Sequence, residues 1–220
     1  MKTLDVVIAE ALDVLKRGGL ILYPTDTVWG IGCDATNEAA VQKVFALKRR
    51  AEAKSLVLLA CDLDMVARYV KKIPPIAVDL VEVNDAPMTI VYPGAIVAGA
   101  SGGAAFGLAP ATVAADGSVG IRIPRAAAAR EDDRPVSAGA VFCSRLIYRL
   151  RRPLVSTSAN ISGEAAPSDF AAISSEIRDG VDYVVPAALS PFGRFDDSAT
   201  GRPSQILKLG LDGEIEIIRP

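Results

Sequence analysis

Short, almost wholly apolar runs alternate along this chain with longer segments whose apolar residues recur at helical spacing. Residues 20–23 and 55–60 are such runs, and a run of this kind is typical of a strand that is covered on both faces. Segments 3–16 and 37–48 instead place their apolar residues along one stripe of a helix. Strands that alternate with amphipathic helices predict an α/β domain built around one sheet.

The same patterns predict the elements along the rest of the chain. We expect helices at 3–16, 37–48, 62–72 and 141–151, the third ending before Pro74-Pro75, and strands at 20–23, 55–60, 89–92, 119–123 and 154–156. Residues 205–209 and 214–218, joined across Asp212-Gly213, predict a terminal hairpin. Because a hairpin closes an otherwise alternating chain, we expect the sheet to be mixed.

The chain has 220 residues, which suits a single domain over 1–220. Two segments lack the periodicity of a packed element: an Ala/Gly-rich stretch at 94–116, and residues 126–140, where alanines precede a run of charges. We interpret both as surface loops inserted into the domain. The first segment does not predict a membrane span, because alanine and glycine offer too little apolar surface for insertion into a bilayer.

Composition excludes several kinds of chemistry. The chain has no histidine, which excludes histidine-based triads and histidine metal ligands. Cys33, Cys61 and Cys143 are too widely spaced for a disulfide framework or a Cys-x-x-Cys metal site, and the N-terminus shows no secretory signal, so we expect a cytoplasmic protein. The net charge of −2 lacks the basic excess typical of nucleic-acid binding, so any bound anion must be held by a local cluster.

Polar clusters interrupt the apolar pattern at the ends of predicted strands, where open α/β sheets bind ligands. Residues 24–32 (Pro-Thr-Asp-Thr-Val-Trp-Gly-Ile-Gly) suit either a turn closed by a side-chain hydrogen bond or a loop that approaches a ligand. Residues 156–163 (Ser-Thr-Ser-Ala-Asn-Ile-Ser-Gly) follow a buried strand. These polar groups either cap a following helix and build a turn, or line a ligand pocket. Burying so many of them without partners is costly, which favours the pocket.

Cations gather where the second predicted helix ends. Lys48, Arg49 and Arg50 close that helix, and Lys54 follows. Such a group either stabilises the helix dipole or binds a polyphosphate, with arginine as a bidentate fork and lysine as a point charge. The dipole accounts for Arg49, but it does not account for Lys48, which lies on the buried stripe of the helix.

Arg122 lies within the predicted strand 119–123. Because side chains alternate along a strand, it points away from the face of Ile121 and Ile123, toward either solvent or a cleft. On its own, this position predicts a solvent-exposed arginine.

Taken together and in this order, the motifs resemble the YrdC family, the L-threonylcarbamoyladenylate synthases of tRNA modification. The resemblance rests on residues 22–32, 48–56, 87–89, 120–124 and 156–163. It implies a single YrdC-like α/β domain, an open twisted mixed sheet with flanking helices and a central, positively charged cleft. It also implies a nucleotidyltransferase that condenses ATP, L-threonine and bicarbonate to threonylcarbamoyl-AMP and pyrophosphate.

The resemblance assigns roles to individual residues. Lys48 and Arg50 would be catalytic, and Thr27, Ser158 and Arg122 would bind L-threonine. The residues implied for ATP are Lys48, Arg50, Lys54, Thr89, Ser156, Asn160 and Ser204. No protein-held metal is implied, and Mg²⁺ would arrive with ATP. The expected partners are downstream threonylcarbamoyl-transferase proteins, with tRNA contact permitted but not required, and no membrane.

Two alternatives come from other classes of protein. A non-catalytic RNA-binding module would use the same basic cleft, but the net charge of −2 and the aromatic content of 5% argue against it. A carbamoyl-transfer domain of hydrogenase maturation would share the fold, but such domains belong to longer chains with cysteine-rich zinc modules.

Overall fold

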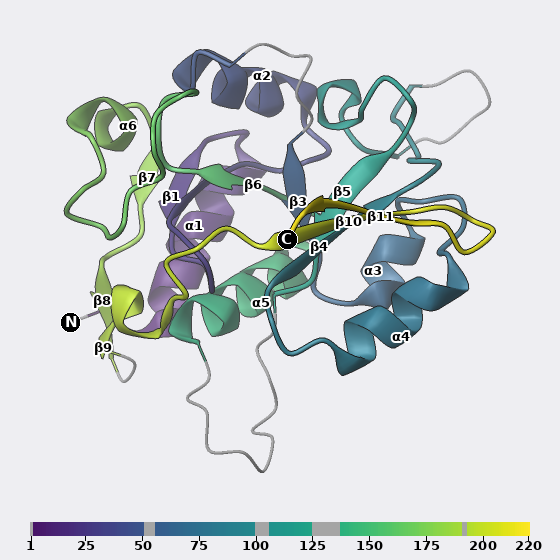
Figure 1. Ribbon diagram of the computed structural model, residues 1–220. Coiled ribbons are helices and arrows are strands. Elements are labelled where there is room, and N and C mark those ends of the chain that lie inside the picture. Colours follow the sequence, from purple (N-terminus) through teal and green to yellow (C-terminus); the bar gives the residue numbers. More distant parts are fainter. Residues whose placement is uncertain (1, 51–55, 100–105, 125–136, 191–192) are drawn as a thin grey trace.

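The computed structural model describes residues 2–50, 56–99, 106–124, 137–190 and 193–220, apart from the side chains of residues 197 and 198. Within these residues, a nine-stranded sheet forms the centre of the molecule and helices pack around it (Figure 1). Its strand order is β11-β10-β4-β5-β3-β6-β2-β1-β7. The strands are β1 (Ile21–Tyr23), β2 (Gly30–Gly32), β3 (Val57–Leu59), β4 (Met88–Tyr92), β5 (Val119–Arg122), β6 (Leu154–Ser158), β7 (Tyr183–Val184), β10 (Gln205–Leu209) and β11 (Ile215–Arg219). A small separate sheet pairs β8 (Ala188–Leu189) with β9 (Gly193–Arg194).

The large sheet is mixed and open. β3 runs parallel to β5, β10 to β4, and β1 to β7, whereas the remaining neighbours are antiparallel. The predicted terminal hairpin is present as β10 and β11. The predicted class, an α/β fold with an open mixed sheet and flanking helices, is confirmed, whereas the charged cleft stays a prediction.

One face of the sheet forms the floor of the core. Val155, Leu58, Ile121 and Ile90 are aligned partners across β6, β3, β5 and β4, and none is more than 2% exposed. Partners on neighbouring strands project to the same face, so these side chains make a continuous apolar row. Each of these strands therefore buries alternate side chains in this row. The residues between them project from the opposite face of the sheet.

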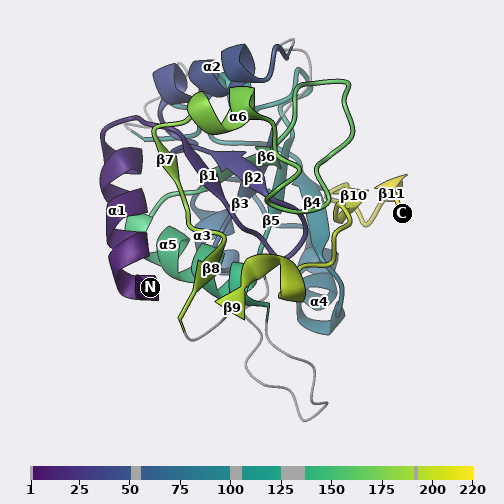
Figure 2. The same ribbon diagram turned by 90° about the vertical axis from the view of Figure 1, so that its left-hand side faces the viewer.

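The helices are α1 (Leu4–Lys16), α2 (Glu38–Leu47), α3 (Leu63–Ala67), α4 (Pro75–Val83), α5 (Ala138–Leu150) and α6 (Ser175–Asp179). α1 and α5 pack against each other, as Figures 1 and 2 show. α2 begins where Asn37 accepts a hydrogen bond from the backbone N–H of Ala40 at 3.1 Å, which is the usual N-cap arrangement. The predictions for the first, second and last of the four helices are confirmed.

The predicted helix 62–72 is wrong in length. α3 ends at Ala67, because Val70 forms a β-bridge with Ala95 and the N–H of Lys71 donates to the carbonyl of Gly94 at 2.8 Å. Tyr69 and Val70 are still buried, so the apolar spacing reported burial correctly but not conformation. α4 was not predicted. It begins at Pro75, which occupies the first turn, where a missing N–H costs nothing.

The prediction of surface loops is wrong for parts of both segments. In 94–116, Leu108, Ala109 and Thr112 are buried, and the N–H of Ala109 donates to the carbonyl of Ala35 at 2.9 Å. In 126–140, the last residues belong to the buried start of α5. Residues 100–105 and 126–136 lie outside the described part of the chain.

Candidate functional site

The predicted polar residues on three strands project from the face opposite to the apolar row. Arg122 of β5 is the direct partner of Thr89 of β4. β3 joins β5 to β6, and its registers carry the same face to Ser156 and Ser158 on β6. The backbone alone therefore places these four residues on one face, which we call the polar face.

Lys48 joins α2 to the loop after β6. It is 2% exposed, which confirms that it lies on the buried stripe of its helix. Its Nζ donates to the backbone carbonyls of Ser158 and Asn160, each at 2.5 Å. The N–H of Ser162 donates in turn to the carbonyl of Lys48 at 2.9 Å. The end of α2 is thus fastened to the hydroxyl-rich loop.

The pKa of the Lys48 ammonium is lowered by its surroundings. Burial, followed by the positive charge of Arg50, lowers the pKa of the Lys48 ammonium to about 8, and Glu164 opposes this shift. Lys48 is therefore mostly charged at neutral pH and loses its proton in mildly alkaline solution.

Arg49 and Arg50, the next two cations of this cluster, have different surroundings. Arg49 has a φ of 50° and turns toward α6, where its guanidinium pairs with Glu176 at 2.7 Å. Arg50 stays partly buried, and this burial lowers the pKa of its guanidinium. The predicted site residue Lys54 lies outside the described residues. Arg49 therefore has a structural partner on α6, an ion pair that the sequence did not predict.

The prediction that Arg122 is solvent-exposed is wrong. Its side chain is 4% exposed and forms a buried ion pair with Asp26. Asp26 lies in the loop after β1, so the pair ties that loop to the polar face. Sequence spacing showed which face Arg122 occupies, but only the fold shows that a carboxylate lies there.

The loop after β1 also fixes the direction in which Thr27 donates. Thr25 Oγ1 gives its only proton to the carbonyl of Val28 at 2.8 Å. Thr27 Oγ1 lies 2.8 Å from Thr25 Oγ1, so Thr27 must be the donor in that pair. The lone pairs of the Thr27 oxygen therefore stay available to accept a hydrogen bond from a ligand.

A segment distant in sequence crosses this loop. The N–H groups of Thr200 and Gly201 donate to the carbonyls of Asp26 and Thr27 at 3.0 and 2.9 Å. Trp29 Nε1 donates to Asp196 at 2.7 Å. The position of the loop therefore depends on Asp196, Thr200 and Gly201, which the motifs did not include.

α5 approaches the same loop through Gly139. A Cβ atom at Gly139 would lie 2.1 Å from the carbonyl oxygen of Thr25, which is too close for any side chain. The glycine therefore sets how near the first turn of α5 lies to the loop. Its only signal in the sequence is a glycine between two alanines.

Thr89 and Ser204 form a second buried pair on the polar face, with their hydroxyl oxygens 2.8 Å apart. Arg219 was not predicted, because the expected strand ended at residue 218. Its Nε donates to the carbonyl of Ser204 at 2.8 Å, and its terminal nitrogen lies 3.5 Å from Ser204 Oγ. Ser204 thus links the predicted residue Thr89 to an arginine on the edge strand.

Asn160 carries an unused acceptor. Its Nδ2 donates to the carbonyls of Ile161 and Glu164 at 3.0 and 2.8 Å, which fixes the orientation of the amide. Its Oδ1 is buried and has no hydrogen-bond partner among the described residues. A buried acceptor without a partner is costly, so this atom is suited to accept an N–H or O–H of a ligand.

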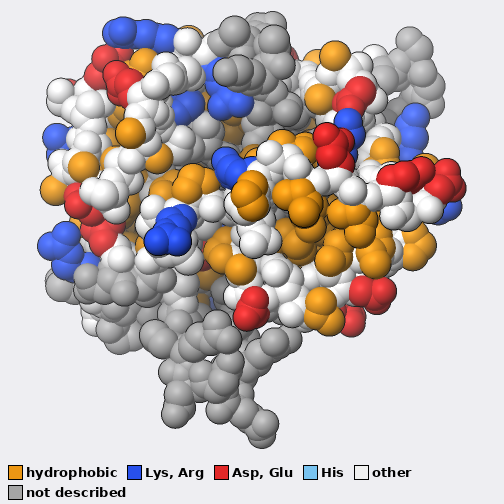
Figure 3. All heavy atoms as spheres, in the orientation of Figure 1, with side chains coloured by type: hydrophobic (Ala, Val, Ile, Leu, Met, Phe, Trp, Pro, Cys, Tyr) orange, Lys and Arg blue, Asp and Glu red, His pale blue; other side chains and the backbone are white. Residues whose placement is uncertain are grey.

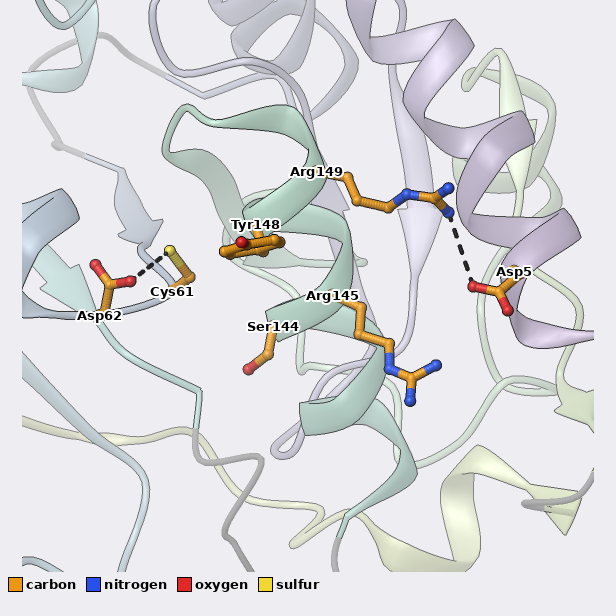
Figure 4. A pocket seen from close by; sticks show the side chains of 7 residues that line it. All are labelled: Asp5, Cys61, Asp62, Ser144, Arg145, Tyr148 and Arg149. Carbon is orange, nitrogen blue, oxygen red and sulfur yellow. Dashed lines mark hydrogen bonds and ion pairs between the residues drawn. The ribbon is translucent and has the colours of Figure 1, made fainter.

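A pocket of about 470 Å³ lies elsewhere, on the outer face of α5 (Figure 4). None of the predicted site residues lines it. Burial, followed by a hydrogen bond with Asp62, raises the pKa of its Cys61 thiol to about 12, so the thiol is not a nucleophile at neutral pH. Arg149, which also lines it, lies 3.8 Å from Asp5. We do not assign the predicted chemistry to this pocket.

The described residues also bear on metals and membranes. They contain no group of three His, Cys, Asp or Glu side chains that could hold a metal ion. On the polar face, the carboxylate of Asp26 is already paired with Arg122. The described part of the chain also contains no helix long and apolar enough to cross a bilayer.

The surface in the orientation of Figure 1 is uneven in character. Lys and Arg side chains gather below α2 and toward the middle of this face, whereas apolar side chains cover the region between β11 and α4 (Figure 3). Ile215, Ile217 and Val83 are among the exposed apolar residues of these elements.

The structure is an open α/β sheet with one arginine and three hydroxyl side chains on one face, next to a loop with an unpaired amide oxygen, and this arrangement suits small polar ligands. Residues 13–220 match the Sua5/YciO/YrdC family, whose description is "Telomere recombination", and the chain belongs to that family. A relative named threonylcarbamoyl-AMP synthase, from Halorhodospira halophila, is 30% identical over 202 residues, which cover 91% of this chain and 93% of the relative.

Solved structures show the same fold. E. coli YciO superposes with a TM-score of 0.71 at 18% identity and covers 100% of this chain and 90% of its own. P. abyssi Sua5 complexed with L-threonine gives a TM-score of 0.70 at 23% identity over 92% of this chain. The match spans 50% of the Sua5 chain.

Proposed function

We propose that this protein is an L-threonylcarbamoyladenylate synthase, which condenses ATP, L-threonine and bicarbonate. The observation that carries the proposal is the likeness to relatives named threonylcarbamoyl-AMP synthase over nearly the whole chain. The polar face supports it, since Thr89, Arg122, Ser156 and Ser158 lie on it and Lys48 and Ser204 hydrogen-bond to its residues.

The proposed reaction needs no covalent nucleophile from the protein. The amine of threonine and bicarbonate form a carbamate with loss of water, and a carbamate oxygen then attacks the α-phosphorus of ATP. The bond from that phosphorus to the bridging oxygen breaks, and pyrophosphate leaves with both bonding electrons. The protein has to hold anionic reactants together and stabilise developing charge, which suits cations and small donors.

Lys48 and Arg50 are the proposed catalytic cations. The Lys48 ammonium donates hydrogen bonds to two backbone carbonyls. We therefore expect it to act chiefly through its charge and by holding the loop of Ser158 and Asn160 in place. Arg50 follows it directly and offers the fork that matches phosphate oxygens. We assign Lys54 to the same role from the motif alone.

The remaining proposed contacts follow from unused hydrogen-bonding capacity. Asn160 Oδ1 is proposed to accept an N–H of the nucleotide, and Ser156 is proposed to contact the same nucleotide. The Thr27 oxygen is an acceptor suited to the hydroxyl or amine of threonine, and Ser158 is proposed to contact the same amino acid. Because Arg122 is paired with Asp26, we propose that it acts on threonine by holding the Thr27 loop.

Several parts of the proposal rest on the family resemblance. Thr89 and Ser204 are proposed to contact ATP, and Mg²⁺ is proposed to arrive with the triphosphate, since the described residues provide no carboxylate cluster for it. Downstream threonylcarbamoyl-transferase proteins would take the product, tRNA contact is permitted but not required, and a cytoplasmic location stays a prediction.

The test is pyrophosphate release by the purified protein. We expect release that requires ATP, L-threonine and bicarbonate together, and that falls at least tenfold in Lys48→Ala and Arg50→Ala. Arg49→Ala is the matched control, because its guanidinium pairs with Glu176, and it should keep wild-type activity. Absence of threonine-dependent release, together with tight tRNA binding, would favour the RNA-binding module instead.

A further inference from the structure

Asp196 contacts the loop after β1 from a distant part of the chain, although no motif includes it. It lies in a short 3-10 helix, η2 (Phe195–Ser198). Its Oδ1 accepts the hydrogen bond that Trp29 Nε1 donates at 2.7 Å. The Asp196 side chain is 15% exposed and Trp29 is 3% exposed, so little water competes for this hydrogen bond. A carboxylate acceptor at such a distance in a nearly dry environment holds the indole firmly.

The same hydrogen bond fixes the direction of the indole ring. Trp29 packs against two phenylalanine rings, with centroid distances of 4.8 Å to Phe170 and 6.2 Å to Phe195. Such ring contacts allow several relative orientations, whereas a hydrogen bond from the ring nitrogen allows one narrow range of directions. The N–H of Phe170 also donates weakly to Asp196 Oδ2, at 3.5 Å. One carboxylate therefore joins Trp29 to the segment that packs against it.

Trp29 connects the loop after β1 to the loop after β6. Its carbonyl accepts a hydrogen bond from the N–H of Ala159 at 3.0 Å, and the next residue, Gly30, is the register partner of Ser158. Thr27 lies two residues before Trp29. The position of Trp29 therefore determines how Thr27 lies relative to Ser158, and these are two of the residues proposed to bind L-threonine.

The residues that follow η2 contact the middle of the same loop. The backbone N–H groups of Thr200 and Gly201 donate to the carbonyls of Asp26 and Thr27. These hydrogen bonds use only the backbone, so they depend on where the segment runs and not on its side chains. Asp196 attaches the start of this segment to the loop through a side chain, and its loss should therefore loosen the whole arrangement.

The loop after β6 has attachments that do not involve Asp196. Lys48 Nζ donates to the carbonyls of Ser158 and Asn160, and Asn160 Nδ2 donates to two backbone carbonyls. These contacts remain when Asp196 is replaced. Because the proposed nucleotide contacts lie on this side, the loss of Asp196 should weaken threonine binding much more than ATP binding.

We infer that Asp196 is a positioning residue for L-threonine: its carboxylate holds Trp29 and so keeps Thr27 and Ser158 at the spacing that binds the amino acid. This inference rests on the proposed function for the identity of the substrate. Asp196 acts through Trp29 and is not a catalytic residue.

Calorimetric titration with L-threonine tests the inference. The dissociation constant should rise at least tenfold in Asp196→Leu, about 1.4 kcal/mol, and much less in Asp196→Asn, whose amide oxygen still accepts from the indole of Trp29. The dissociation constant of ATP should stay within twofold of the wild type in both variants. Arg194→Gln is the matched control, because Arg194 is exposed and approaches only Oδ2 of the same carboxylate, at 3.4 Å. It should bind threonine like the wild type.

A second readout comes from Trp29, which is the single tryptophan of the chain. Acrylamide should quench its fluorescence more strongly in Asp196→Leu than in Asp196→Asn or Arg194→Gln, because the indole loses its fixed position. Trp29→Phe removes the N–H but keeps a ring, and it should weaken threonine binding as much as Asp196→Leu does. The double variant should bind no more weakly than either single variant, as expected for two residues that act through one hydrogen bond.

The outcomes separate this inference from the proposed function. Threonine affinity in Asp196→Leu that equals that of Arg194→Gln overturns the inference, as does an equal loss of ATP affinity or an equal loss in Asp196→Asn. If Asp196→Leu does not fold, Trp29→Phe decides, and wild-type threonine affinity in that variant overturns the inference. A wild-type protein whose threonine binding depends on Asp196 but that makes no threonylcarbamoyl-AMP supports the inference and contradicts the proposed function. Product formation with an unchanged KM for threonine in Asp196→Leu overturns the inference alone.

Discussion

Replacing Arg122 with methionine tests the buried ion pair at the centre of the polar face. The side chains of Arg122 and Asp26 are 4% and 9% exposed, so Arg122→Met leaves a carboxylate buried without its partner. Breaking a buried pair from one side costs about 3–5 kcal/mol. Because a domain has a total stability of about 5–15 kcal/mol, this is a large fraction of the free energy of unfolding.

Equilibrium unfolding in urea measures the loss. We expect Arg122→Met to lower the free energy of unfolding by about 3–5 kcal/mol, and the double variant Arg122→Met/Asp26→Leu to recover most of it, because no uncompensated charge stays buried. The control is Lys208→Met, which breaks an exposed pair with Asp116 and should cost about 0–1 kcal/mol. A loss below about 1 kcal/mol in Arg122→Met would refute the argument that burial makes this pair structurally important.

Three further predictions concern other contacts. ATP affinity without threonine should fall between pH 7 and pH 9 with a midpoint near 8, because the Lys48 ammonium, whose pKa is about 8, loses its charge over this range. Lys48→Arg should abolish this pH dependence, and a variant that keeps the wild-type pH profile would contradict the assignment. Gly139→Ala should cost about 1–3 kcal/mol in thermal unfolding and raise the KM for threonine, since its Cβ would displace the carbonyl of Thr25; wild-type values for both would show that the loop yields freely. Thr89→Val removes the hydroxyl that lies 2.8 Å from Ser204 Oγ and should cost about 1–3 kcal/mol in urea unfolding; a free energy of unfolding equal to that of the wild type would contradict this prediction.

Much of the fold follows from periodicity. The apolar row of Val155, Leu58, Ile121 and Ile90 explains why the strand predictions succeed, since a strand buried by its neighbours reads as a short apolar run. The helix 62–72 fails for the opposite reason. Its apolar spacing reports burial of Tyr69 and Val70, but a bridge to Ala95 determines their conformation, and local spacing carries no information on that partner.

The same distinction applies to the candidate site. Helical spacing predicts that Lys48 is buried, because its position relative to its own helix decides this. The environment of Arg122 depends on Asp26, which is distant in sequence, so spacing gives its face but not its partner. Arg219 and Gly139 were missed since their importance comes only from contacts with Ser204 and Thr25. The substrate-binding and catalytic roles of individual residues were predicted only from the resemblance to the family, because no local pattern in the sequence indicates them.

The fate of a labelled carbon tests the central claim most directly. The purified protein is incubated with ATP, L-threonine and [¹³C]bicarbonate, and the nucleotide products are analysed by mass spectrometry. The account predicts threonylcarbamoyl-AMP that carries the label in its carbamoyl group, formed in equal amount with pyrophosphate and lost in Lys48→Ala. Formation of only unlabelled AMP or ADP, or of no product while ATP is bound, would contradict the account.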